Sequence, residues 1–102
     1  MRIIKVSRIQ EFARLHPRAK PSLTEWLAKA LATRWGDFNE LRGTFPKADH
    51  VKVASGKTVV VFNVGGNNFR MIGGVHFNTG FVFILRFMTH AEYDKDQWKE
   101  TL

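Results

Sequence analysis

The stretch that decides the fold is TVVVFNVGGNNFRMIGGVHF, residues 58–77. Residues 58–64 are rich in β-branched side chains, which pack well in strands. The next four residues are two glycines and two asparagines, and both types accept the positive φ angles of a hairpin turn. Residues 69–77 then return as a second strand, in which Gly73 and Gly74 indicate a bulge or a close approach of another segment. This stretch predicts an antiparallel hairpin at the centre of a sheet.

Three further strands extend the predicted sheet. Residues 2–6 form a short strand at the start of the chain, and residues 51–53 form another before the hairpin. After a turn at 78–80, residues 81–88 form the last strand, and strict alternation divides its side chains between two faces. One face is expected to carry Phe81, Phe83, Leu85 and Phe87, and the other Val82, Ile84, Arg86 and Met88.

Two helices are predicted between the first strand and the hairpin. The first covers 8–16 and ends at Pro17, because the residue before a proline avoids helical angles. The second begins at a capping box of Ser22 and Glu25 and stops near Gly36. Since only a few residues connect the two helices, we expect them to form an antiparallel pair.

A final helix is predicted to begin at Thr89, where Thr89 and Glu92 form another capping box. Ala91, Lys95 and Trp98 fall on one side of this helix. The order of elements is β-α-α-β-β-β-α, an α+β fold with a mainly antiparallel sheet. A chain of 102 residues suits one domain, covering 1–102.

The charge of the chain indicates its class of partner. Sixteen Lys and Arg against nine Asp and Glu give a net charge of +7. A small protein this basic attracts polyanions, of which nucleic acid is the usual one, although charge can also serve solubility alone. The chain has no cysteine, no apolar run that spans a bilayer and no signal peptide, which together favour the cytoplasm.

Arg70 and Arg86 each stand in an otherwise apolar strand. Arginine in a strand interior costs desolvation free energy unless it is paired or faces a wet groove. One interpretation is an ion pair, or a side chain that reaches solvent at the edge of the sheet. The other is a phosphate clamp, because the guanidinium group matches phosphate oxygens and stays charged at any working pH.

The densest cluster of reactive side chains is THAEYDK, residues 89–95. On a helix, His90, Tyr93 and Asp94 share one face because they stand at i, i+3 and i+4. Cleaving RNA without a metal requires a base for the 2′-hydroxyl, an acid for the departing 5′-oxygen and positive charge for the phosphate. His90 and Tyr93 are therefore predicted to transfer protons, while the two strand arginines hold the phosphate.

In this hypothesis Asp94 orients His90, and Lys95 and Lys57 add positive charge against the RNA. The structural alternative treats Tyr93 as a packing aromatic and Asp94 as a favourable charge near a helix N-terminus. The other three histidines show no metal-ligand spacing, so no metal site is predicted.

The segments VFNVGGNNFR, residues 61–70, and FMTHAEYDK, residues 87–95, resemble the HigB family of toxins. FPKAD, residues 45–49, and the region of Trp26 and Trp35 resemble the same family. The likeness runs in order through almost the whole chain. The phrase THAEYD after a hydrophobic strand is more specific than any single catalytic triplet.

The resemblance implies a RelE-like fold, with two helices on one face of a curved sheet and the other face open. It implies an mRNA interferase that cuts transcripts on translating ribosomes and needs no metal cofactor. It also implies a HigA-like antitoxin with a helix-turn-helix domain, so that operator DNA is bound only through the toxin–antitoxin complex. The matching motif positions are Arg70, Arg86, His90, Tyr93 and Asp94.

Two other functions stay open at this point. A non-catalytic RNA-binding or ribosome-binding domain would carry the same charge. A toxin remnant that mainly binds its antitoxin would carry the same motifs. The integrity of transcripts and the toxicity of the expressed protein distinguish these alternatives from a nuclease.

Overall fold

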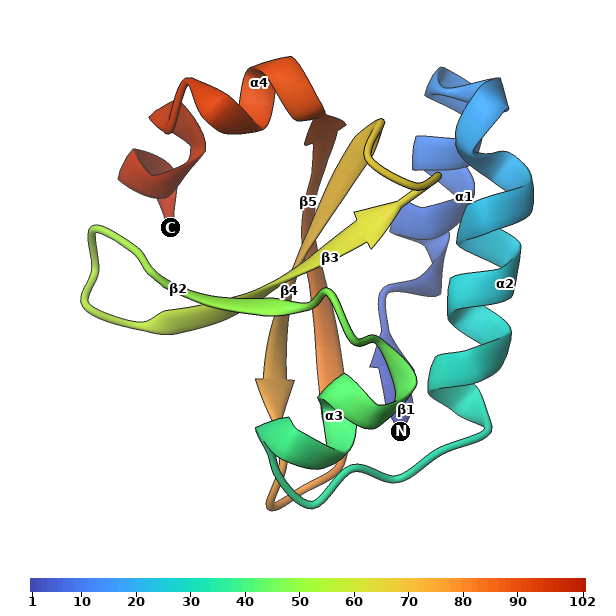
Figure 1. Cartoon of the computed structure of the whole chain (residues 1–102), viewed down its shortest axis with the longest axis vertical. Helices are drawn as coiled ribbons and strands as arrows, with labels where there is room; N and C mark the ends of the chain where they lie inside the picture. The colour runs from blue at the N-terminus through green and yellow to red at the C-terminus, as the bar shows by residue number, and fades with distance from the viewer.

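The computed structural model describes the whole chain, residues 1–102, and has the predicted α+β architecture (Figure 1). Its helices are α1 (Val6–Leu15), α2 (Lys20–Leu31), α3 (Phe38–Thr44) and α4 (His90–Asp94). Its strands are β1 (Arg2–Ile4), β2 (Asp49–Lys52), β3 (Thr58–Val64), β4 (Phe69–His76) and β5 (Phe81–Thr89). Two 3₁₀ segments are η1 (Pro17–Ala19) and η2 (Gln97–Thr101). The order β-α-α-α-β-β-β-β-α contains one helix, α3, and one strand, β2, more than β-α-α-β-β-β-α. No helix combines the length and apolar character needed to cross a membrane.

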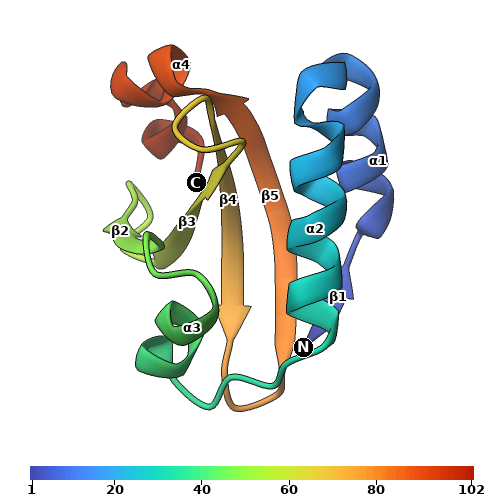
Figure 2. The same ribbon diagram turned by 45° about the vertical axis from the view of Figure 1, so that its right-hand side comes forward.

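The five strands form one sheet in the order β1-β5-β4-β3-β2. β1 runs parallel to β5, and the other neighbouring strands are antiparallel, which confirms the prediction of a mainly antiparallel sheet. α1 and α2 lie side by side against one face, and the chain after β5 turns to the opposite side (Figure 2). The prediction of two N-terminal helices on one face is therefore confirmed.

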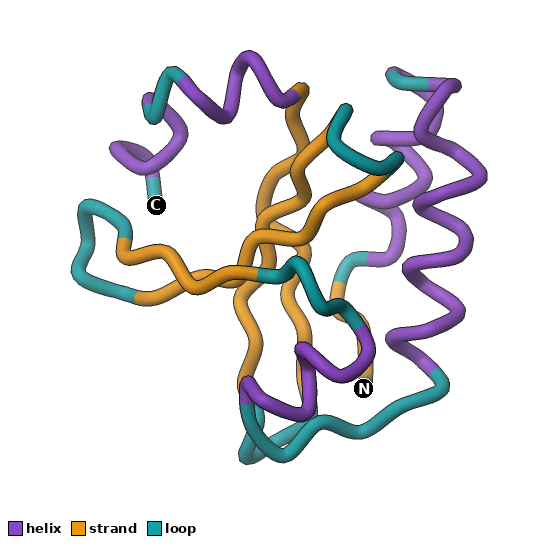
Figure 3. The backbone as a smooth tube through the Cα atoms, in the orientation of Figure 1, coloured by secondary structure: helices purple, strands orange, loops and turns teal.

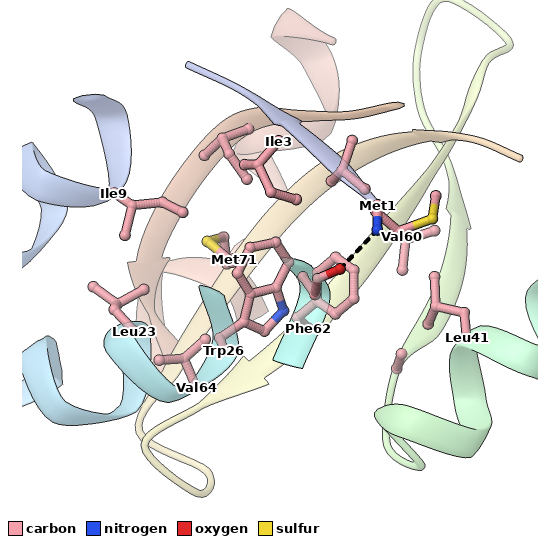
Figure 4. Packing of buried hydrophobic residues seen from close by; sticks show 14 of the residues in the cluster. Met1, Ile3, Ile9, Leu23, Trp26, Leu41, Val60, Phe62, Val64 and Met71 are labelled. Carbon is pink, nitrogen blue, oxygen red and sulfur yellow. Dashed lines mark hydrogen bonds between the residues drawn. The ribbon is translucent and has the colours of Figure 1, made fainter. Parts of the chain in front are cut away.

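The larger hydrophobic core fills the space between these helices and the sheet (Figure 4). Trp26 of α2 packs edge-on against Phe62 of β3, with ring centroids 5.1 Å apart, and both residues are buried. Burying a side chain of this size stabilises the fold by about 1.5–3 kcal/mol. The amino group of Met1 donates to the carbonyl oxygen of Ala30 at 2.9 Å, so the start of β1 is tied to the end of α2.

The predicted starts of the first two helices are wrong. α1 begins at residue 6 because Lys5, with a left-handed φ of 67°, turns the chain directly from β1 into the helix. α2 continues from η1, so Ser22 and Glu25 already lie inside the helix and form no capping box. α2 ends at Leu31, well before the predicted stop at Gly36. Continuation from a preceding 3₁₀ turn replaces the side-chain cap that the sequence pattern suggested.

A bulge in β5 changes which of its side chains share a face. The register pairs Ile72 with Arg86 and Gly73 with Ile84, which leaves Leu85 without an opposite residue. The glycine pair predicted either a bulge or a close approach; the irregularity lies at the step between Ile72 and Gly73, but its extra residue is Leu85 of β5 and both glycines are paired. An extra residue shifts the alternation that follows it, so the predicted division of faces is wrong. Ile84 packs with the helices, whereas Arg86 lies on the other face, beside Ile72.

A smaller core covers part of the face opposite the helices. Its six buried residues are Val53, Val59, Val61, Ile72, Met88 and Trp98. Trp98 reaches this core because α4 ends at Asp94 and Asp96 adopts a left-handed φ of 61°, which turns the chain back over the sheet. The predicted continuation of the helix to Trp98 is wrong, and the face expected to be open is partly closed by the C-terminal segment.

Candidate active site

The β3–β4 turn, the end of β5 and the start of α4 come together at one end of the sheet, where the backbone can be followed in Figure 3. All predicted site residues except Lys57 belong to β4, β5 or the segment that begins with α4. The backbone N–H of His90 donates to the carbonyl oxygen of Asn68 at 2.9 Å, which holds α4 against the turn. Thr89 is paired with Phe69 at the end of the β4–β5 ladder. The last residue of the sheet is therefore also the N-cap of α4, and His90 follows it directly.

The capping box predicted at the start of α4 is confirmed. The hydroxyl of Thr89 accepts from the backbone N–H of Glu92 at 3.2 Å, and the Glu92 carboxylate accepts from the backbone N–H of Thr89 at 3.1 Å. The hydrogen bonds from the Thr89 backbone and hydroxyl lower the pKa of Glu92 below its ordinary value of 4.5. This box fixes the first turn of a short helix and with it the position of His90.

Arg70 is the only buried charged residue of the protein, with 7% of its surface exposed. Its Nη1 donates to the carbonyl oxygens of Asn67 and Phe69, at 3.2 and 3.0 Å. Its Nη2 contacts Oδ1 of Asn67 at 2.5 Å and Nδ1 of His90 at 2.8 Å. Only Nε is left without a partner, and no carboxylate forms a salt bridge with the guanidinium. The buried charge is therefore stabilised by carbonyl oxygens, an amide and an imidazole.

The contacts of His90 define its tautomer. A guanidinium group only donates hydrogen bonds, so Nδ1 of His90 must accept from Arg70. The ring proton then lies on Nε2, which is 3.0 Å from Oδ2 of Asp94. The side chains of His90 and Asp94 are 42% and 60% exposed, so this end of the contact is open to solvent. A chain of contacts thus runs from a buried guanidinium to an accessible carboxylate.

Tyr93 lies between this chain of contacts and the smaller core. The guanidinium carbon of Arg70 is 5.7 Å from the centre of its ring, and Trp98 stacks on the ring at 5.3 Å. Burial is the main cause that raises the pKa of Tyr93 above its ordinary value of 10.0; Lys99 opposes the shift and Asp49 adds to it. The phenol therefore keeps its proton at neutral pH.

Arg86 lies on the same face as Arg70, one strand away. Arg70 is paired with Met88 and Ile72 with Arg86, which makes the two arginines diagonal neighbours across β4 and β5. Nη1 of Arg86 donates to the carbonyl oxygen of Leu85 at 2.9 Å. Its other donors have no protein partner, and the side chain lines a cleft of about 320 Å³ together with Lys95.

Lys57 lies outside this cluster. It is exposed and follows the turn between β2 and β3, whose backbone contacts η2: the N–H of Ala54 donates to the carbonyl oxygen of Lys99 at 3.1 Å. The tip of this hairpin lies beside the C-terminus in Figure 1. The RNA-binding role predicted for Lys57 stays a prediction.

Two contributions to the site were absent from the sequence prediction. Asn67 was interpreted only as a turn residue, yet its side chain holds Arg70. The carbonyl oxygen of Leu85 accepts from Arg86 and, at 3.2 Å, from Arg8 of α1. The pair of asparagines before the strand was the only signal for the first contribution. The second depends on the bulge and on a helix distant in sequence.

The remaining histidines make aromatic contacts. His16 packs against Phe69 and Phe87, with ring centroids 5.4 and 5.5 Å away. The structure contains no group of three His, Asp or Glu side chains placed to hold a metal ion together.

The fold is that of a RelE-like toxic component of a toxin–antitoxin system, and the family model with this description matches residues 19–96. Within that class, the chain belongs to the HigB toxin family. It is 33% identical over 95 residues to the mRNA interferase HigB of Escherichia coli O6:H1, covering 93% of this chain and 90% of that protein. It is also 33% identical over 97 residues to the mRNA interferase toxin HigB of Escherichia coli K12, covering 92% and 88% of the two chains. The mRNA interferase HigB of Shigella flexneri is equally similar.

Proposed function

We propose that this protein is an mRNA interferase, an endoribonuclease toxin that cuts transcripts on translating ribosomes in the cytoplasm. The observation that carries the proposal is the direct contact of Arg70, His90 and Asp94 beside the open cleft at Arg86. The names of the relatives, mRNA interferase HigB, support the same activity.

Arg86 and Lys95 bind the phosphate at the cleavage position in this proposal. Arg86 has unpaired donors at the cleft, and Lys95 lines the same cleft. Fixed positive charge beside the phosphate stabilises the extra negative charge that develops as the 2′-oxygen attacks. Arg70 has little capacity left for a phosphate, because both of its terminal nitrogens have protein partners. In this proposal Arg70 orients His90 and adds positive charge to the site from its buried position in β4.

In this proposal the protons move through side chains of α4. The ribose 2′-oxygen bonds to phosphorus as its proton passes to the carboxylate of Asp94, which the Nε2–H of His90 holds in position. The bond from phosphorus to the 5′-oxygen breaks, and that oxygen takes a proton from the phenol of Tyr93. The products are a 2′,3′-cyclic phosphate and a 5′-hydroxyl, so atoms and charge balance without a metal or a cofactor.

Membership of a toxin–antitoxin family implies an antitoxin partner. We assign this role to a HigA-like protein with a helix-turn-helix domain, which neutralises the toxin. Operator DNA is contacted only through the complex of the two proteins. The net charge of +7 supports binding to the RNA-rich surface of the ribosome.

Inducible expression together with transcript mapping tests the proposal. A reporter transcript is compared with the same transcript lacking its start codon, and new 5′ ends are mapped in both. We expect growth arrest and cuts only in the translated transcript. H90A should abolish the cuts, whereas the matched control H76A, at the exposed far end of β4, should retain them. Intact transcripts during growth arrest would indicate a binding domain, and absence of toxicity would indicate a remnant.

A further inference from the structure

The side chain of Asn67 has a distinct place in the candidate site. Its Oδ1 lies 2.5 Å from Nη2 of Arg70, the same nitrogen that contacts Nδ1 of His90 at 2.8 Å. The two hydrogens of Nη2 are therefore divided between an amide oxygen on one side and the imidazole on the other. Asn67 is exposed, whereas Arg70 is buried. The Asn67 amide therefore holds Nη2 of Arg70 from the solvent side.

The geometry points to Asn67 as a positioning residue that selects the tautomer of His90. A guanidinium group is planar, so an acceptor on one Nη2 hydrogen determines the direction of the other. With Oδ1 of Asn67 in place, the second hydrogen points at Nδ1 and requires that nitrogen to be unprotonated. The ring proton is thereby kept on Nε2, next to Asp94 and solvent. This inference rests on the proposed function for its catalytic consequence, but its structural part concerns the free protein.

The backbone of the turn allows the side chain to be tested separately. Gly65 and Gly66 have positive φ angles, whereas Asn67 does not, so alanine at 67 introduces no backbone strain. The carbonyl oxygen of Asn67 continues to accept from Nη1 of Arg70 after substitution. N67A therefore removes one acceptor from Nη2 and leaves the contacts of Nη1 with the backbone in place, so that the variant tests how Nη2 is directed at His90.

Three variants give the matched comparison. N67A removes the acceptor, and N67D retains an acceptor oxygen at the same position. N78A is the control, because Asn78 is an exposed asparagine in the β4–β5 turn at the other end of the sheet, without side-chain hydrogen bonds. Each variant is compared with the wild type in thermal unfolding, in imidazole ¹⁵N NMR without RNA, and in transcript cleavage in a translating extract.

In the wild type we expect Nδ1 of His90 to give the signal of an unprotonated nitrogen and Nε2 that of a protonated one. N67A should move both signals toward the average of two tautomers and lower kcat about tenfold, with KM within about twofold. N67D should restore both readouts, and N78A should change neither. A purely structural role for Asn67 would lower the unfolding temperature without changing the tautomer.

N67A with the wild-type tautomer and wild-type kcat overturns the positioning role. A wild-type protein that shows the expected imidazole signals but leaves transcripts intact overturns the proposed nuclease function instead. The two failures are distinguishable because the NMR measurement uses no RNA.

Discussion

Nη2 of Arg70 lies 2.8 Å from Nδ1 of His90, so a buried, permanently charged donor is directed at one nitrogen of an exposed imidazole. The guanidinium cannot accept a hydrogen bond, and this fixes which end of the ring is available for chemistry. The ring proton of His90 lies on Nε2, which is 3.0 Å from Oδ2 of Asp94.

R70A should lower kcat by about 10²- to 10³-fold, as expected for loss of a preorganised charged donor at a reaction centre. It should also lower the free energy of unfolding by about 1–3 kcal/mol, because the carbonyl oxygens of Asn67 and Phe69 lose their donor. Cleavage kinetics and denaturant unfolding measure the two effects. A folded R70A protein with wild-type kcat would show that Arg70 has no role in cleavage.

R86A should weaken RNA binding and lower kcat, because the free donors at the cleft are lost. We expect a decrease in kcat/KM of about 10²-fold or more and a shallower dependence of binding on salt. The matched control is R14A, which removes an exposed arginine from α1, on the opposite side of the sheet. Equal effects of the two substitutions would show that Arg86 acts only through the overall positive charge of the protein.

E92Q tests the capping box through its pH dependence. Folding lowers the pKa of Glu92 below its ordinary value of 4.5. The ionised carboxylate therefore contributes its full stabilisation at pH values above 4.5. This contribution is lost as the pH falls through the pKa of Glu92 in the folded protein. E92Q should lower the free energy of unfolding at pH 7 by about 0.3–1 kcal/mol, and the difference should vanish in acid. Urea unfolding at several pH values measures it. A difference that is constant down to pH 3 would contradict the assignment.

The ionisation of Tyr93 can be followed directly, because it is the single tyrosine of the chain. Its pKa is raised chiefly by burial, so the midpoint of the phenolate absorbance change should lie above pH 10.0 in the folded protein. The raised pKa adds stability that is complete below pH 10.0 and is lost as the pH rises through the folded value. W98A, which removes the stacked indole, should move the titration back toward 10.0 while far-ultraviolet circular dichroism reports the fold. A wild-type titration at or below 10.0 would show a solvated phenol.

The parts of the fold that depend on neighbouring residues were predictable from sequence. The β3 strand, the glycine-asparagine turn and the Thr89 capping box agree with the structure because β-branching, positive φ and side-chain caps act within a few residues. The paired glycines indicated an irregularity near the step between Ile72 and Gly73, but not that the extra residue is Leu85 of the neighbouring strand. From these features the sequence predicted that His90 lies close to the two strands that carry Arg70 and Arg86.

The parts that depend on distant segments were not predictable in the same way. The face of Arg86 depends on the unpaired Leu85, whose carbonyl oxygen is also held by Arg8 of α1. The closure of the open face depends on Asp96, where a left-handed turn directs Trp98 onto the sheet. No local pattern indicates either event, because each is stabilised by contacts made only after the chain has folded.

The chemistry of the cut RNA ends is the most direct test of the central claim, that the His90–Asp94 pair and Arg86 direct attack by the ribose 2′-hydroxyl. Fragments from a translating extract treated with the purified protein are analysed for their terminal groups. We expect one fragment of each cut to carry a 5′-hydroxyl and the other a 2′,3′-cyclic phosphate, or the 3′-phosphate that forms from it. Ends with a 5′-phosphate and a free 3′-hydroxyl would show that water attacks instead, and would contradict it.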